Sequence, residues 1–138
     1  MHPFRAAVEA RDETAIEALL SEDVVFTSPV AFKPYSGKAI TAAILRGVMR
    51  VFEDFRYIRE IGEAAGRDHA FIFEATVGGK KVTGCDFLHF DTDGKIVDFM
   101  VMVRPLSAAT AVAAAMGAQF EQIKQEAAEQ IQRQGTQA

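Results

Sequence analysis

The pattern of apolar and polar residues changes its period about halfway along the chain. Before residue 56, apolar side chains recur at the three-to-four spacing of helices. This spacing predicts a helix over residues 3–10, a short helix that begins after Asp12 as its N-cap, and a third helix over 39–52. A strand at 24–28, ended by Pro29, and a loop at 31–37 separate the second helix from the third.

From Arg56 onward apolar residues alternate with polar ones, which is the period of a half-buried strand. Strands are predicted at 56–63, 70–77, 82–90 and 96–104. Gly78-Gly79 and Asp93-Gly94 are two-residue hairpin turns in this interpretation. After Pro105, Ser107 is the predicted N-cap of a last helix that runs to about residue 132 and is broken or loosened at Gly117. The expected fold class is α+β, with helices wrapped around a curved antiparallel sheet.

The two turns fix the register of three strands. If each turn has two loop residues, Val77 pairs with Lys80, Phe71 lies opposite Asp86, and Asp86 lies opposite Val101. Side chains alternate across a strand, so one face receives an almost entirely apolar set. That face comprises Phe71, Phe73, Asp86, Leu88, Phe90, Phe99, Val101 and Val103. It predicts an apolar pocket.

Asp86 is the exception on this face. An ionised carboxylate in apolar surroundings costs several kcal/mol unless it is paired or takes up a proton. We therefore expect a raised pKa and a general acid–base role in an enclosed site. The alternative is a structural aspartate bonded to backbone amides or to a buried arginine.

His69 has the same parity as Asp86 and is diagonal to it, at about 7–8 Å between Cα atoms. It is the candidate partner in an acid–base pair, although a solvated histidine at a strand end is the simpler alternative. His89 and Cys85 face the other way, and no base is predicted beside the thiol. The histidines are scattered and no nucleotide or metal motif occurs, so neither a metal nor a cofactor is expected.

Composition excludes several classes of partner. The chain has 138 residues, 49% apolar and 25% charged, with a net charge of −4. An acidic chain does not attract a phosphate backbone, so nucleic acid is not expected. No apolar run approaches the ~20 residues of a membrane span, and neither a signal peptide nor a cysteine pair is present, which together predict a cytoplasmic protein.

The order of helix, helix, strand, helix and strand meander resembles the cone-shaped nuclear-transport-factor-2-like fold, shared by ketosteroid isomerases, limonene epoxide hydrolases and SnoaL-like polyketide cyclases. The most specific segment, CDFLHFDTDGKIVDF, spans residues 85–99. It is similar to the isomerase segment whose protonated aspartate donates a hydrogen bond to the dienolate oxygen, a role that falls on Asp86. In that family the surroundings of the aspartate keep its carboxylic acid neutral.

Two other isomerase groups are missing here. The segment at 24–37 resembles the family's strand that ends in an aspartate base before proline, and Ser28 occupies that position. The family's tyrosine on the first helix is replaced by Phe4. The resemblance thus disfavours the usual ketosteroid isomerase activity and the three-residue water activation of the hydrolases. Cyclase-type chemistry through a single aspartate is less affected.

Three hypotheses follow. The chain is a cofactor-free isomerase- or cyclase-type enzyme that acts on a small hydrophobic carbonyl compound, a non-catalytic binder of a hydrophobic ligand, or a dimerisation module with a vestigial pocket. In the first, Asp86 and His69 are catalytic. The predicted ligand-binding residues are Phe4, Phe26, Ser28, Phe71, Phe73, Leu88, Phe99, Val101 and Val103.

A homodimer is expected in every case, through the sheet face that carries Ile72, Phe87, Met100 and Met102. The domain is expected to span residues 1–132, with a disordered tail at 133–138.

Overall fold

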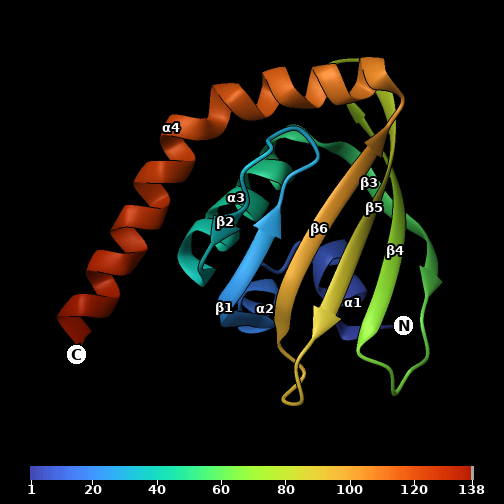
Figure 1. Cartoon of the computed structure of the whole chain (residues 1–138). Helices are drawn as coiled ribbons and strands as arrows, with labels where there is room; N and C mark the ends of the chain where they lie inside the picture. Colours follow the sequence, from blue (N-terminus) through green and yellow to red (C-terminus); the bar gives the residue numbers. More distant parts are fainter. Residues whose placement is uncertain (138) are drawn as a thin grey trace.

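The computed structural model describes residues 1–137, with side chains through residue 133. Its centre is a curved six-stranded sheet (Figure 1) in the order β2-β1-β6-β5-β4-β3. The strands are β1 (Leu20–Thr27), β2 (Tyr35–Ser36), β3 (Glu53–Ile61), β4 (Asp68–Val77), β5 (Lys80–Phe90) and β6 (Ile96–Arg104). The expected α+β class is confirmed. The sheet is mixed rather than wholly antiparallel, because β1 pairs with β6 in parallel.

Four helices accompany the sheet. They are α1 (Pro3–Glu9), α2 (Glu13–Ala18), α3 (Lys38–Val51) and α4 (Leu106–Gln137). Asp12 caps α2 as predicted, since its side chain accepts a hydrogen bond from the backbone N–H of Ala15. Buried side chains of α1, α3 and α4 form one core with the inner face of the sheet. Within the described helices, no segment has the length and apolarity of a bilayer span.

The first hairpin has the predicted register. Val77 pairs with Lys80, and Phe71 lies opposite Asp86. Gly78 and Gly79 have φ angles of 56° and 78°. Positive φ at both loop positions is what a tight type I′ hairpin turn requires, and glycine adopts it without a steric penalty.

The second hairpin differs locally from the prediction. Its loop has three residues, 92–94, because the N–H of Asp91 bonds the carbonyl of Lys95 at 2.8 Å while that of Gly94 bonds the carbonyl of Asp91. An irregularity where Phe90 pairs with Ile96 compensates for the extra residue. Asp86 consequently still lies opposite Val101.

Three further expectations are corrected in the segments that border the cavity. The predicted loop 31–37 contains strand β2, which pairs with β1. The last helix begins at Leu106, and Ser107 lies inside its first turn instead of capping it. The carbonyl of Pro105 accepts the N–H of Ala109. The helix is also continuous through Gly117.

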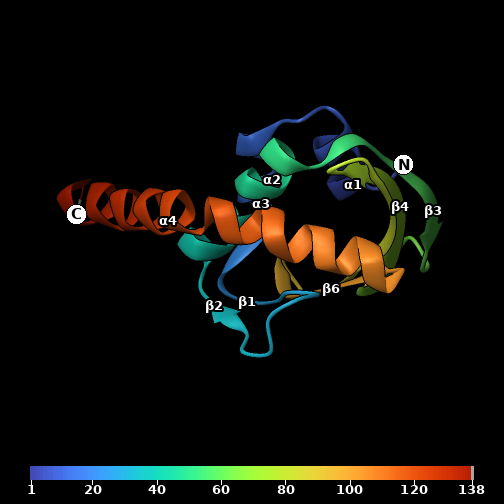
Figure 2. The same ribbon diagram turned by 90° about the horizontal axis from the view of Figure 1, so that it is seen from above.

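The long helix α4 closes one end of the molecule. Figure 2, seen from above, shows its first half crossing over the sheet, and Figure 1 shows it bent about halfway along. Its second half lies along α3, where Ile123 packs against Gly47 and Glu126 pairs with Arg46 and Arg50. The expected tail at 133–138 overlaps the end of this helix, and residue 138 lies outside the described residues.

Candidate functional site

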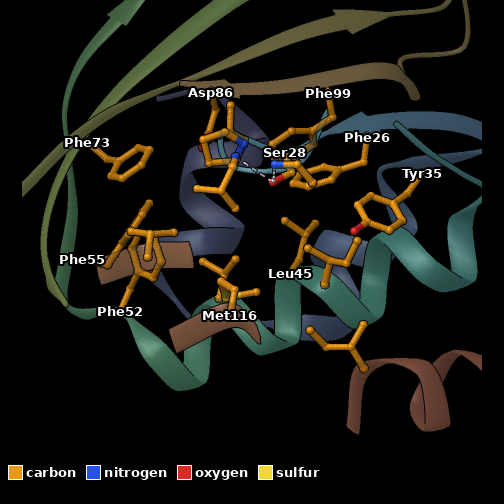
Figure 3. Close-up of a pocket in the computed structure, with 18 of the residues that line it drawn as sticks. Phe26, Ser28, Tyr35, Leu45, Phe52, Phe55, Phe73, Asp86, Phe99 and Met116 are labelled. Carbon is orange, nitrogen blue, oxygen red and sulfur yellow. Dashed lines mark hydrogen bonds between the residues drawn. The ribbon is translucent and has the colours of Figure 1, made fainter. Parts of the chain in front are cut away.

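A cavity of about 300 Å³ lies between the inner face of the sheet and helices α3 and α4. In Figure 3, Asp86, Phe99 and Phe26 lie on its sheet side, and Leu45 and Met116 lie on its helix side. The lining is almost wholly apolar and includes seven phenylalanines. Four lining side chains carry a nitrogen or oxygen atom, namely Ser28, Tyr35, Tyr57 and Asp86.

Asp86 is placed by the alternation of β5 in the middle of the sheet, between Phe71 on β4 and Val101 on β6. Its residue is 5% exposed, so its carboxyl is removed from bulk water. The burial of Asp86, which the sequence predicts from the hairpin register, is confirmed.

Tyr57 is the partner of this carboxyl. Its hydroxyl donates a hydrogen bond to Asp86 Oδ2 at 2.5 Å, which is in the range of strong bonds to carboxylates. Tyr57 is 4% exposed and comes from β3, two strands away from β5. No hydrogen bond to Asp86 Oδ1 is formed by the described part of the chain. One carboxyl oxygen is thus bonded within the protein, and the other forms no hydrogen bond with the described residues.

The two groups perturb one another's ionisation. Burial raises the pKa of Asp86 from its ordinary 3.8 to about 7, and the hydrogen bond from Tyr57 opposes this rise. Burial, followed by the charge of Asp86, raises the pKa of Tyr57 well above its ordinary 10. Near neutral pH Asp86 is therefore present in both forms while Tyr57 remains a donor.

Ser28 and Tyr35 stand near the end of the cavity formed by β1 and β2. Ser28 Oγ accepts the backbone N–H groups of Val30 at 3.0 Å and Ala31 at 3.2 Å. Tyr35 pairs with Phe26 across β1 and β2.

Six of the predicted ligand-binding residues line this cavity. They are Phe4, Phe26, Ser28, Phe73, Phe99 and Val101. Phe71 and Leu88 are buried in the core behind the lining, and Val103 packs partly buried against that core.

The structure does not bring His69 to Asp86. His69 pairs with Leu88 across the strands, and its Nε2 lies 2.8 Å from the carbonyl of Gly66. The fully buried ring of Phe71 contacts both His69 and Tyr57 and stands between them. His69 instead lines a separate pocket together with His2, and the centroids of the two imidazole rings are 4.7 Å apart.

Tyr57 and the lining residues of α2, α3 and α4 are not among the predicted site residues. The strand at Tyr57 is joined to the next one by a longer loop, and its pairing with β4 is irregular on both sides of Tyr57. Its parity could not be derived from a turn. The spacing in α3 did indicate a buried stripe, including Ile44, Leu45 and Val48, but not which cavity it faces.

The chain was compared with known protein families. The model of the family described as "SnoaL-like domain" matches residues 2–99, which is more than half of the chain. The chain belongs to the SnoaL-like domain family. No match was found among curated proteins.

Solved structures similar to this SnoaL-like protein extend the comparison. A crystal structure named as a steroid delta-isomerase, from Pseudomonas aeruginosa, is 42% identical, with a TM-score of 0.81 over 86% of this chain and 87% of that one. An uncharacterised protein with a cystatin-like fold from Silicibacter pomeroyi is 35% identical, with a TM-score of 0.79 over 90% and 91%. An NTF2-like protein from Cytophaga hutchinsonii, 18% identical with a TM-score of 0.58 over 77% and 88%, supports the fold alone.

The charged groups of the site are few. No lysine, arginine or histidine lines the Asp86 cavity within the described residues. Across residues 1–137, no three His, Cys, Asp or Glu side chains are grouped to hold a metal ion. Asp86 is the one ionisable acid near neutrality on the described cavity wall, so proton transfer there has a single candidate group.

Proposed function

We propose that this SnoaL-like protein binds a small, mostly apolar carbonyl compound and catalyses proton transfer next to its carbonyl group, as in an isomerisation or a cyclisation. The observation that carries the proposal is the position of Asp86. It is a buried carboxyl on the wall of an apolar cavity of about 300 Å³, and only one of its oxygens is bonded by the described residues, to Tyr57 at 2.5 Å. This volume is at the lower end of small-molecule pockets, which span about 300–1,000 Å³.

The chemistry follows from the two forms of Asp86. As a carboxylate, Asp86 removes a proton from the carbon beside the carbonyl, and the Tyr57 hydroxyl stabilises the carboxylate through Oδ2. The substrate becomes an enolate, and Asp86 becomes the neutral acid. The acid then returns the proton to another carbon, or to an oxygen after the enolate has attacked a second carbonyl. A pKa near 7 suits a group that must act as both base and acid.

A two-carboxylate proton shuttle is not supported by the cavity. Both acceptor positions of Ser28 Oγ are occupied by backbone N–H groups, so this hydroxyl cannot take a proton from a substrate. Asp86 is the only carboxylate among the lining residues of the described chain. The proposal therefore assigns both halves of the proton transfer to Asp86, without His69.

The test is exchange of hydrogen for deuterium at carbons next to a carbonyl. The protein is incubated in D₂O with 5-androstene-3,17-dione, chosen because a similar structure is named as a steroid delta-isomerase. Mass spectrometry measures deuterium uptake, and ultraviolet absorption measures conjugation of the double bond. We expect Asp86→Asn to remove protein-dependent exchange while the protein stays folded. Full exchange in that variant would remove Asp86 from the mechanism.

Tyr57→Phe is the companion variant. It keeps the carboxyl but removes the hydrogen bond that lowers the pKa of Asp86. We expect exchange to continue at a reduced rate, with the acid limb of its pH profile moved to higher pH. An unchanged profile would separate Tyr57 from the proton transfer.

A non-catalytic binder is the second candidate, and a specific observation favours it. The cavity offers one acid–base group within the described chain, whereas proton transfer between two carbons is commonly divided between a base and a separate donor to the oxygen. If the protein binds a carbonyl ligand and never accelerates exchange, the binder is the correct function. The dimerisation-module hypothesis required a cavity too small for any ligand, and 300 Å³ does not favour it.

A further inference from the structure

Ser28 presents a hydrogen-bond donor to the cavity. A serine hydroxyl can accept two hydrogen bonds and donate one. The N–H groups of Val30 and Ala31 occupy the two acceptor positions of Ser28 Oγ. The described residues provide no acceptor for its hydroxyl hydrogen, and Ser28 lines the cavity. Its hydroxyl hydrogen is therefore available to an acceptor in the cavity.

Tyr35 presents a second donor from the neighbouring strand. It also lines the cavity, and its ring packs 6.1 Å from that of Phe120 on α4. Figure 3 shows Tyr35 on the opposite side of the cavity from Phe55 and Phe73, with its hydroxyl directed inward. No hydrogen bond to this hydroxyl is formed by residues 1–133.

The sheet register sets the distance between the backbones of Ser28 and Asp86. Thr27 pairs with Met100, so Ser28 follows at the level of Val101, and Val101 pairs with Asp86. Ser28 and Asp86 consequently lie at one level of the sheet, with β6 between them. Adjacent strands are about 4.8 Å apart, so the two backbones are roughly 10 Å apart. The cavity has a polar group at each end of this interval and an apolar lining between.

The charge of the lining decides what kind of acceptor fits. A carboxylate or phosphate would require a cation or several amides in this apolar lining, because an uncompensated charge in apolar surroundings is strongly disfavoured. No cationic side chain lines the described cavity. Two neutral hydroxyl donors suit a neutral oxygen, such as that of a ketone, an ester or an alcohol.

We infer that the ligand of this cavity is a neutral molecule with two oxygen atoms joined by an apolar skeleton, with one carbonyl group beside Asp86 and the other oxygen bound by the hydroxyl groups of Ser28 and Tyr35. This inference rests on the proposed function and assigns Ser28 and Tyr35 as specificity-determining residues. They select molecules oxygenated at both ends over molecules oxygenated at one end.

The test uses two stable steroid probes that differ only in the second oxygen, androst-4-ene-3,17-dione and androst-4-en-3-one. Isothermal titration calorimetry measures the Kd of both for the full chain and for Ser28→Ala, Tyr35→Phe and the double variant. Ser36→Ala is the matched control, since Ser36 is exposed beside Tyr35 and does not line the cavity. A neutral hydrogen bond contributes about 0.5–1.5 kcal/mol, which corresponds to roughly 2- to 12-fold in Kd.

We expect the full chain to bind the dione at least roughly 5-fold more tightly than the mono-ketone. Ser28→Ala and Tyr35→Phe should each weaken the dione alone, and Ser36→Ala should weaken neither probe. Because Ser28→Ala also leaves two backbone N–H groups without their acceptor, it can loosen residues 28–31. A loosened loop weakens both probes equally, so that result from Ser28→Ala, together with an unchanged dione affinity in Tyr35→Phe, overturns the inference.

Two further results separate this inference from the proposed function. If both probes bind the full chain equally, Ser28 and Tyr35 do not bind a second ligand oxygen, and the proposed role of Asp86 is unaffected. If neither probe binds, the proposed function fails for carbonyl compounds of this size, and the inference fails with it.

Discussion

Asp86 couples the stability of the protein to pH, because its carboxyl is exposed in the unfolded chain and buried in the folded one. Its pKa rises from 3.8 to about 7 on folding. Below pH 4 both states hold the proton. Between pH 4 and 7 the unfolded chain releases it while the folded chain keeps it, so stability falls as the pH rises. Above pH 7 both states are ionised and the penalty is constant.

Asp86→Asn should therefore change the pH dependence of stability in one direction. The amide does not ionise, so the penalty that burial imposes on the carboxylate disappears. Each pKa unit corresponds to about 1.4 kcal/mol, so the stability of the variant relative to the parent should rise by on the order of a few kcal/mol from pH 5 to pH 8. Urea unfolding at pH 5, 6, 7 and 8 measures this difference.

Asp23→Asn is the control for the loss of one negative charge, since Asp23 is exposed on β1. The amide introduced by Asp86→Asn also has hydrogen-bonding needs of its own, but these add a constant that does not vary with pH. A difference between Asp86→Asn and the parent that stays the same from pH 5 to pH 8 would contradict the buried, proton-binding state of Asp86.

What could be predicted at individual residues depended on nearby turns. Asp86 lies on β5, the strand shared by two hairpins that have glycine in their loops. Its face and its cross-strand neighbours were therefore predicted correctly. The three-residue loop at 92–94 did not disturb this result, because an irregularity near Phe90 restored the register. Tyr57 had no such marker, since its strand is followed by a longer connection and pairs irregularly with β4. The hydroxyl that completes the Asp86 site was therefore beyond local sequence patterns.

At the scale of elements, the central hairpin depends on a glycine that makes room for an aromatic ring. Gly84 on β5 lies opposite Phe73 on β4. A Cβ atom at Gly84 would lie 2.2 Å from Cζ of Phe73 and 2.9 Å from the backbone oxygen of Met102. Phe73 in turn stacks on Phe55 with ring centroids 4.7 Å apart, and both rings line the cavity. The absence of a side chain at residue 84 thus shapes the cavity wall.

Gly84→Ala should destabilise the protein by about 1–3 kcal/mol, the usual cost of an overpacked core. The clash includes a backbone atom, which cannot move away as a side chain can. Gly117→Ala is the matched control, because Gly117 lies within α4 and a Cβ there meets nothing within 4 Å. Alanine should stabilise that helix by up to about 1 kcal/mol. Thermal unfolding of both variants tests the contrast, and a loss of stability no larger in Gly84→Ala than in Gly117→Ala would show that the sheet relaxes around the added methyl group.

At the scale of the whole molecule, the helices cover one face of the sheet and leave apolar side chains on the other. Phe87 and Met102 are 38% and 54% exposed, on neighbouring strands. Their cross-strand partners on the same face, Met100 and Cys85, extend the patch. Polar pairs flank it, with Arg56 bonded to Glu74 and His89 to Asp68. An apolar centre with a polar rim is the usual composition of a protein interface.

We propose that this outer face joins two copies of the chain in a homodimer. A twofold interface is self-complementary, so each substitution within the patch acts twice. Phe87→Asp or Met102→Glu would bring two carboxylates together across the axis, or bury them without partners, and either outcome costs more than a weak dimer can tolerate. The inner-face core, including Asp86, faces away from these positions and should keep its fold.

Sedimentation equilibrium at micromolar concentration measures the result. The parent chain is expected at twice its 15.1 kDa monomer mass, and both outer-face variants at the monomer mass with unchanged circular dichroism. Ile131→Asp introduces the same charge at an exposed apolar residue on α4 and should remain dimeric. If that variant dissociates while Phe87→Asp does not, α4 forms the interface instead. A parent chain that sediments as a monomer would leave the outer face without this function. Because each copy keeps its cavity on the inner side of its own sheet, dissociation by Phe87→Asp should leave probe binding at Asp86 intact.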